Sequence, residues 1–213
     1  MPTNSQSQDS KAFFAIYGGS FDPPHLAHLE ILKILNNNPL CLKIILLPNY
    51  RNPLKSQTLF TPKERLKMCE ILAQTSGDKT IINDYEIKQN RPVHTIESIS
   101  ALQKQFLDSY PLSYAQAKLC FVLGSDSFQS LHLWKDSQSL CKLVEFIVIK
   151  RESNAITYPQ NLKPQIRESI SLSHFNPISS SKVRELLHNG EIEKALKMLP
   201  QQIFPFIHTH FKL

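Results

Sequence analysis

The sequence predicts an α/β fold, a Rossmann-like, doubly wound and mostly parallel sheet with helices on both faces and a small C-terminal helical part. Three observations support this. Short apolar runs recur along the chain, stretches of helical period separate them, and the residues suited to chemistry follow the runs. Parallel strands covered on both faces form continuous apolar runs, and ligands bind beyond their carboxyl ends.

The apolar runs predict four buried strands, at 12–17, 42–48, 118–124 and 144–150. Residues 80–87 and 170–175 are two further strand candidates. Residues 151–170 are polar and contain two prolines, which predicts an exposed connection with little secondary structure.

Helices are predicted between these strands from their spacing and their caps. Leucines at positions 26, 29, 32 and 35 mark one helical face after the first strand. Thr61 is a predicted cap, and Pro62 suits the first turn that follows it. Thr95 is a predicted cap of a later helix whose apolar face begins at Ile96.

Length and composition predict a globular protein that favours anionic partners. The 213 residues suit a single domain over 12–213, preceded by a flexible tail over 1–11. Apolar residues make up 41% and charged residues 20%, and the net charge is +6. The four cysteines form no C-x-x-C pair, which favours reduced thiols and a cytoplasmic location. No apolar run is long enough to span a membrane, so no membrane partner is expected, and the oligomeric state stays open.

The stretch "GGSFDPPHLAH" follows the first predicted strand and suits a phosphate-binding turn. Gly18 and Gly19 allow a ligand to approach the backbone, and the prolines stiffen the lead into the helix. His25 and His28 then lie on one face of the first helical turn, where the amide-rich positive end favours phosphate. Metal ligation by H-x-x-H is the competing interpretation, but the sequence offers no third ligand nearby, and we predict no protein metal site.

A second stretch, "NPISSSKVREL", lies near the other end of the chain. Ser179, Ser180 and Ser181 offer caps and hydroxyls to a helix start, and Arg184 could join them around an anion. An ordinary serine-capped helix with a surface arginine is the structural alternative for this stretch on its own.

Together the two stretches resemble the paired motifs of the nucleotidyltransferase superfamily, T/H-x-G-H and I-S-S-T-x-[IV]-R. Ala27 and Ser181 are mild departures from those patterns, and Val183 stands where isoleucine is the usual residue. The resemblance implies that 12–213 is one nucleotidyltransferase domain with His25, His28 and Arg184 as catalytic residues. It implies an ATP site made of the following residues: Gly18, Gly19, Ser20, Phe21, Ser179, Ser180, Ser181, Gly124 and Asp126.

Three intermediate segments are similar to bacterial nicotinate-nucleotide adenylyltransferases. These are "LLPNYRNPLK", "EIKQNRPVHTIESI" and "FVLGSDSFQSLHLW", in the family's order. The resemblance implies a nicotinate mononucleotide site formed by Asn49, Lys55, Thr95 and Trp134. Val93 and His94 depart from the family's serine and tyrosine beside Thr95.

The implied reaction is direct in-line transfer of the adenylyl group of ATP to nicotinate mononucleotide, with Mg²⁺ bound to the triphosphate. The products are nicotinate adenine dinucleotide and pyrophosphate. Phosphopantetheine and nicotinamide mononucleotide remain alternative acceptors, and a non-catalytic nucleotide-binding protein is a further alternative. A nucleic-acid partner is not expected, because the sequence contains no concentrated basic helix or aromatic RNA-binding motif.

Overall fold

The computed structural model describes residues 12–51, 58–109, 116–150, 155–175 and 177–211. Within these ranges the chain forms a six-stranded sheet in the order β3-β2-β1-β4-β5-β6. Every neighbouring pair is parallel, so the predicted mostly parallel sheet is parallel throughout its described strands. The strands are β1 (Phe13–Gly19), β2 (Cys41–Pro48), β3 (Thr80–Ile82), β4 (Lys118–Gly124), β5 (Glu145–Lys150) and β6 (Ile166–Ser171).

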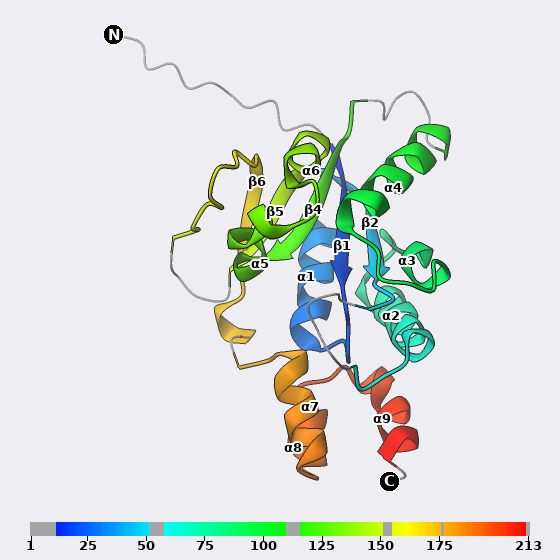
Figure 1. Cartoon of the computed structure of the whole chain (residues 1–213). Coiled ribbons are helices and arrows are strands. Elements are labelled where there is room, and N and C mark those ends of the chain that lie inside the picture. The colour runs from blue at the N-terminus through cyan, green and yellow to red at the C-terminus, as the bar shows by residue number, and fades with distance from the viewer. Residues whose placement is uncertain (1–11, 52–57, 110–115, 151–154, 176, 212–213) are drawn as a thin grey trace.

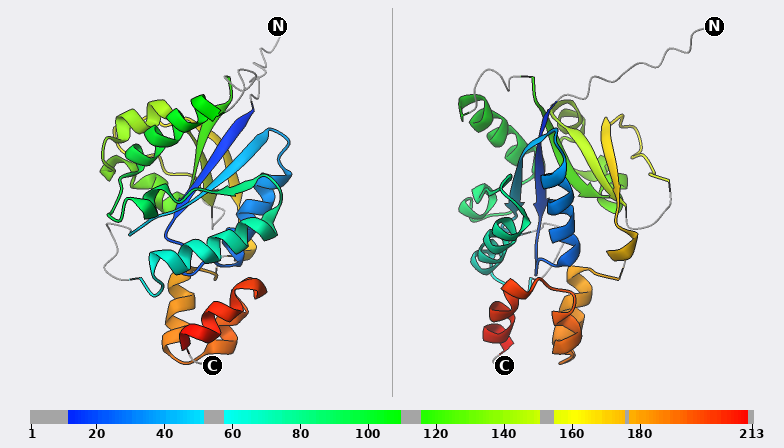
Figure 2. Two further views of the ribbon diagram at one scale, coloured as in Figure 1. Left: turned by 90° about the vertical axis from the view of Figure 1, so that its right-hand side faces the viewer. Right: turned by 180° about the vertical axis from the view of Figure 1, so that it is seen from behind.

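Helices cover both faces of this sheet, as the sequence predicts (Figures 1 and 2). One apolar cluster joins β1 to α1 (Leu26–Asn37) and α2 (Pro62–Ser76), through residues such as Ala15, Leu32 and Leu72. The other joins the opposite face of β1 to α4 (Thr95–Ser109), α5 (Ser125–Gln129) and α6 (Ser137–Leu143). The short α3 (Tyr85–Lys88) and the 3₁₀ turn η2 (Leu131–Leu133) complete this part of the chain.

The C-terminal helices lie beyond the carboxyl end of the sheet (Figure 1). They are α7 (Ser180–His188), α8 (Ile192–Leu196) and α9 (Phe204–Phe211), with 3₁₀ turns η3 (Ser173–Phe175) and η4 (Gln201–Ile203). A third apolar cluster holds them against Phe60 and Met68 at the start of α2. The small C-terminal helical part is therefore joined to the main sheet layer by its own core.

The strand order places a crevice between the central strands β1 and β4, at their carboxyl ends. β1 pairs with β2 as far as Gly19, which lies opposite Pro48, whereas its pairing with β4 ends at Tyr17 and Val122. The sheet order reverses at this pair of strands, because β1 connects outward to β2 on one side and β4 leads to β5 on the other. Ligands of doubly wound folds bind at such a switch point.

Three predictions from the sequence are wrong in detail. The strand expected over 80–87 ends at Ile82 and is followed by α3, because Asn83 accepts the Tyr85 amide and turns the chain. The last strand is 166–171 instead of 170–175, so part of the connection predicted over 151–170 is in the sheet. Thr95 is the first residue of α4 and not its cap, since the carbonyl of His94 accepts the amides of Glu97 and Ser98.

Other predictions about local structure are confirmed or lie outside the described residues. α1 begins at Leu26, and the Thr61 hydroxyl caps α2 by accepting the Glu64 amide. The expected tail over 1–11 and the candidate site residue Lys55 lie outside the described ranges. In the part of the chain that is described, no helix is long and apolar enough to cross a membrane.

Candidate active site

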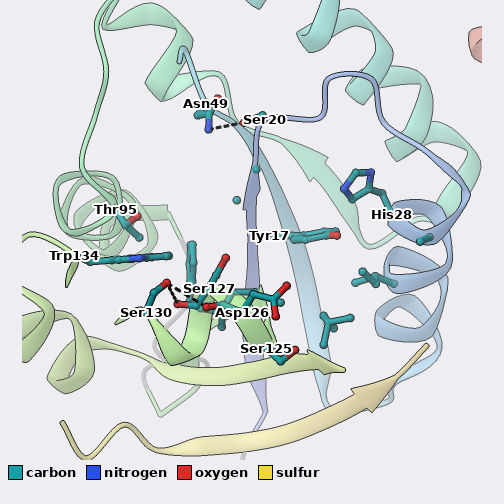
Figure 3. Close-up of a pocket in the computed structure, with 18 of the residues that line it drawn as sticks. Tyr17, Ser20, His28, Asn49, Thr95, Ser125, Asp126, Ser127, Ser130 and Trp134 are labelled. Carbon is teal, nitrogen blue, oxygen red and sulfur yellow. Dashed lines mark hydrogen bonds between the residues drawn. The ribbon is translucent and has the colours of Figure 1, made fainter. Parts of the chain in front are cut away.

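The carboxyl edge of the sheet opens into a cavity of about 680 Å³, a volume that suits a nucleotide-sized ligand. Ten candidate residues from the sequence line it, drawn from five regions of the chain. They are Gly18, Gly19, Ser20, His25, His28, Asn49, Thr95, Gly124, Asp126 and Trp134. Figure 3 shows Thr95 and Trp134 at one side, with His28 and Tyr17 at the other.

The two histidines form a stacked pair at the start of α1. Their ring centroids are 3.6 Å apart and their planes are inclined by 24°. The backbone amide of His25 donates to Nδ1 of His28 at 3.1 Å. Because Nδ1 accepts this bond, the neutral imidazole of His28 carries its proton on Nε2. His28 is therefore fixed at the helix end and has its second ring nitrogen as a donor.

A compact aromatic turn joins β1 to these histidines. Phe21 has a positive φ of 48°, a backbone conformation that residues other than glycine rarely adopt. Its ring is almost fully buried and meets Tyr17 and His28 edge-on, at 5.4 and 5.0 Å between centroids. Phe21 does not line the cavity as the sequence suggests, and it supports the ring of His28 from behind.

Gly18 has a packing reason as well as a position on the cavity wall. A Cβ at this residue would lie 3.1 Å from the ring of Phe121. Phe121 in turn meets Trp134 edge-on, with 6.0 Å between ring centroids. The missing side chain of Gly18 therefore makes room for the ring that supports Trp134 at the other side of the cavity.

Arg184 and the serine turn reach the site indirectly. Arg184 Nη1 donates to the main-chain oxygen of Asp22 at 2.6 Å and lies 3.6 Å from its carboxylate. Ser180 Oγ donates to the carbonyl of Pro23 at 2.9 Å, and Ser179 caps α7. None of Ser179, Ser180, Ser181 and Arg184 lines the cavity. Arg184 and Ser180 hold the backbone of Asp22 and Pro23, which lie three and two residues before His25.

Glu86 is a buried carboxyl group in the cavity wall that sequence reasoning gave no role. It accepts a hydrogen bond from Ser98 Oγ at 2.7 Å and is 7% exposed. Burial raises the pKa of Glu86, the Ser98 hydrogen bond opposes this, and nearby Glu97 adds to the rise.

Glu86→Gln is expected to raise the melting temperature at neutral pH. The folded state binds this proton more tightly than the unfolded chain, so the ionised carboxylate costs stability above its raised pKa. That cost disappears as the pH falls through the raised pKa towards the ordinary value of 4.5. Melting curves across pH should show the two proteins converging below this window.

Glu97→Gln is the matched control of opposite sign. Its hydrogen bond with Arg91 lowers the pKa of Glu97, so its stabilising effect is present above 4.5 and is lost as the pH falls through the lowered pKa. A melting temperature for Glu86→Gln that is below wild type at neutral pH, as for Glu97→Gln, contradicts the prediction.

Gly124→Ala is expected to lower kcat/KM without lowering stability. Gly124 has an ordinary φ of −70°, it is exposed in the cavity wall, and a Cβ there meets nothing within 4 Å. The added methyl group occupies ligand space, while the stiffer unfolded chain contributes about 0.4–1 kcal/mol of stability. Kinetics and thermal melting test the two effects separately.

Gly190→Ala is the control for this change. Gly190 also has open space, but its φ of +75° strains an alanine. We expect it to lose stability and keep kcat/KM, and a Gly124→Ala enzyme with unchanged kcat/KM contradicts a ligand at that wall.

The cavity has an apolar wall that the sequence analysis did not single out. Ile149, Leu172, Phe175 and Ile178 form it, from the end of β5 and the segment that follows β6. The signal available in the sequence was the end of the apolar run at 144–150, which marks a strand end. Tyr17 also lines the cavity and was not predicted to do so, and Val93 and His94, the two departures from the family motif beside Thr95, line it as well.

These features define a nucleotide-binding α/β protein with a phosphate-suited turn between β1 and α1. Consistent with that class, a cytidylyltransferase-like family model matches residues 16–186. A Helicobacter hepaticus protein named probable nicotinate-nucleotide adenylyltransferase is 41% identical, covering 96% of this chain and 99% of its own. A Campylobacter fetus protein of the same name is 37% identical, with coverages of 85% and 91%. The chain belongs to the nicotinate-nucleotide adenylyltransferase family.

The fold is also similar to a solved structure. Plasmodium falciparum nicotinic acid mononucleotide adenylyltransferase complexed with NaAD has a TM-score of 0.70 and 24% identity. The match covers 93% of this chain and 96% of that one. At this identity the likeness concerns the fold, and it agrees with the Rossmann-like sheet described above.

Proposed function

We propose that this protein transfers the adenylyl group of ATP to nicotinate mononucleotide, giving nicotinate adenine dinucleotide and pyrophosphate. The observation that carries the proposal is that one cavity joins the His25–His28 turn to the Thr95–Trp134 wall. Such a cavity can hold a polyphosphate against the helix start and a flat heteroaromatic ring against Trp134. The relatives of the same family support this choice of substrates.

An oxygen of the mononucleotide 5′-phosphate attacks the α-phosphorus of ATP. The new phosphorus–oxygen bond forms as the bond to the bridging oxygen of the β-phosphate breaks, and that oxygen leaves with pyrophosphate. The nucleophile is already ionised at neutral pH, so no general base is required. The barrier then lies in alignment and charge repulsion, which hydrogen-bond donors and cations lower.

The histidine turn is suited to this task. Nε2 of His28 donates a hydrogen bond to an α-phosphate oxygen, and His25 lies stacked against it at the same end of α1. The twelve-residue α1 adds its positive amino-terminal end. Arg184 and the turn over Ser179–Ser181 do not line the cavity, so they act on the leaving pyrophosphate through the backbone of Asp22 and Pro23, which Arg184 and Ser180 hold.

The remaining walls suit the two nucleoside parts. The Trp134 ring offers a flat face for the pyridine, beside Thr95. The wall over Ile149 and Phe175 gives an apolar surface for the adenine ring. Asp126 at the end of β4 suits hydrogen bonds from ribose hydroxyls, and Asn49 approaches the site from β2.

Mg²⁺ is the metal we propose, bound to the triphosphate. It neutralises phosphate charge when bound, and it takes its ligands largely from phosphate oxygens and water. Of the two carboxylates in the wall, Asp126 is exposed and Glu86 is buried, so Asp126 would be the one to meet this hydrated ion. In the described ranges no group of three or more histidine, cysteine, aspartate or glutamate side chains could hold a metal ion.

We also infer that the reaction takes place in the cytoplasm and that 12–213 acts as one domain. Three of the four cysteines are buried free thiols, and burial raises the pKa of Cys41 to about 11. Such thiols suit a reducing compartment.

Pyrophosphate release tests the proposed function. The purified full chain is given ATP and Mg²⁺ with nicotinate mononucleotide, nicotinamide mononucleotide, phosphopantetheine or water. We expect release with nicotinate mononucleotide and formation of the dinucleotide. Faster turnover with another acceptor overturns the substrate assignment, and ATP binding without release in any arm favours a non-catalytic nucleotide-binding protein.

A further inference from the structure

Arg65 is a fully buried cation on α2, with an exposed fraction of 0%. An unpaired charge in such a place costs free energy unless hydrogen bonds replace its water. Burial lowers the pKa of Arg65, and the Asp22 carboxylate opposes this. Burying the Arg65 guanidinium therefore costs free energy of folding. The groups that accept its hydrogen bonds show which segments it holds together.

Four main-chain carbonyls accept hydrogen bonds from this guanidinium. Nη1 donates to Ser20 at 2.6 Å and to Asn49 at 2.8 Å. Nη2 donates to Tyr50 at 2.6 Å, and Nε donates to Phe60 at 3.3 Å. One side chain therefore ties together the loops after β1 and β2 and the loop before α2.

Two of these partners are part of the cavity wall. Ser20 and Asn49 line it directly, one after the end of each strand. The main-chain amide of Asn49 also donates to the carbonyl oxygen of Gly19 at 2.9 Å. Its side-chain Nδ2 donates to Ser20 Oγ at 3.3 Å (Figure 3). The pairing of β1 with β2 ends at Gly19 and Pro48, so beyond that point Arg65 holds the loops in register.

We propose that Arg65 is a positioning residue for adenylyl transfer, which sets the backbone after β1 and β2 against the bound nucleotides. This rests on the proposed function. Its planar guanidinium presents five donors in a fixed fork and reaches several carbonyls at once. A lysine ammonium keeps the charge but lacks that geometry, so Arg65→Lys separates positioning from charge.

Arg167 provides a matched control for general loss of stability. Its side chain is 14% exposed, pairs with Glu145 at 3.0 Å and lies 4.4 Å over the Phe13 ring. Arg167, Glu145 and Phe13 lie at the amino-terminal ends of β6, β5 and β1. The cavity lies at the carboxyl ends of the strands, so this control is at the opposite end of the sheet. Arg167→Lys should lower the melting temperature without touching the site.

The experiment compares full-length wild type, Arg65→Lys and Arg167→Lys at a temperature where circular dichroism shows all three folded. We expect Arg65→Lys to lower kcat/KM roughly 100-fold, the scale of a small misplacement of reacting groups. We expect kcat to carry more of the loss than KM, because the loops align the two substrates. Arg167→Lys should keep both constants.

Calorimetry with ATP adds a measurement that does not depend on turnover. We expect weaker ATP binding by Arg65→Lys and unchanged binding by Arg167→Lys. A wild-type protein that binds ATP but releases no pyrophosphate overturns the proposed function, while this comparison still decides the role of Arg65.

Three results overturn the proposal for Arg65. The first is wild-type kcat/KM and ATP affinity in Arg65→Lys, and the second is an equal loss in Arg167→Lys. The third is failure of both Arg65→Lys and Arg65→Gln to fold at any temperature, because the guanidinium then serves the whole fold and not the two loops.

Discussion

His28→Ala is expected to lower kcat by about 10²–10³, the cost of removing one well-placed donor from a site that stabilises developing charge. Nδ1 of His28 accepts the amide of His25, so the neutral ring carries its proton on Nε2, the donor that we assign to a phosphate oxygen. Steady-state kinetics with ATP and nicotinate mononucleotide measures the loss, and thermal melting measures the accompanying effect on α1.

His28→Gln separates these two effects. Glutamine is a favoured residue at this helix position, because its oxygen can accept the N-cap amide as Nδ1 does now. We expect it to recover the melting temperature that alanine loses, yet to recover only part of kcat. Full recovery of kcat together with stability assigns the ring to capping, and an His28→Ala enzyme of wild-type kcat contradicts the donor role altogether.

Much of the fold could be predicted because the sheet is buried on both sides. The runs at 42–48 and 118–124 lie within or at the observed strands, since a strand covered on both faces is apolar along most of its length. β3 and β6 were less predictable because both are edge strands. β3 has only three residues, and β6 is largely polar, so neither has a run long enough to mark its ends.

The histidine turn of the site could be predicted from residue types and their spacing. The contacts in which a side chain binds main-chain carbonyls of distant loops could not. Two histidines three apart at a helix start are expected on one face of its first turn, and their rings stack at 3.6 Å between centroids. Arg65 looks like an ordinary helix residue in the sequence, because its partners are carbonyls that carry no sequence signature. Asp22 lies within the stretch "GGSFDPPHLAH", but the role of its carboxylate depends on the segment before α2 and on α7, which are far along the chain.

Asp22→Ala is expected to cost about 3–5 kcal/mol of folding free energy, as for one partner removed from a buried ion pair. Asp22 is 2% exposed, and its carboxylate accepts the amides of Leu59 at 2.9 Å and Phe60 at 2.8 Å. Arg184 lies 3.6 Å from the same carboxylate. In a chain of this size the melting temperature should fall by roughly 10 °C.

Asp22→Asn and Asp78→Ala set the scale for this loss. Asparagine keeps one acceptor oxygen and removes the charge, so its melting temperature should lie between those of wild type and Asp22→Ala. Asp78 is exposed, so Asp78→Ala should change little. Below its melting temperature Asp22→Ala should also lose kcat/KM, because the carboxylate anchors the turn that ends in His25. Equal melting temperatures for Asp22→Ala and Asp78→Ala contradict a structural link between this turn, α2 and α7.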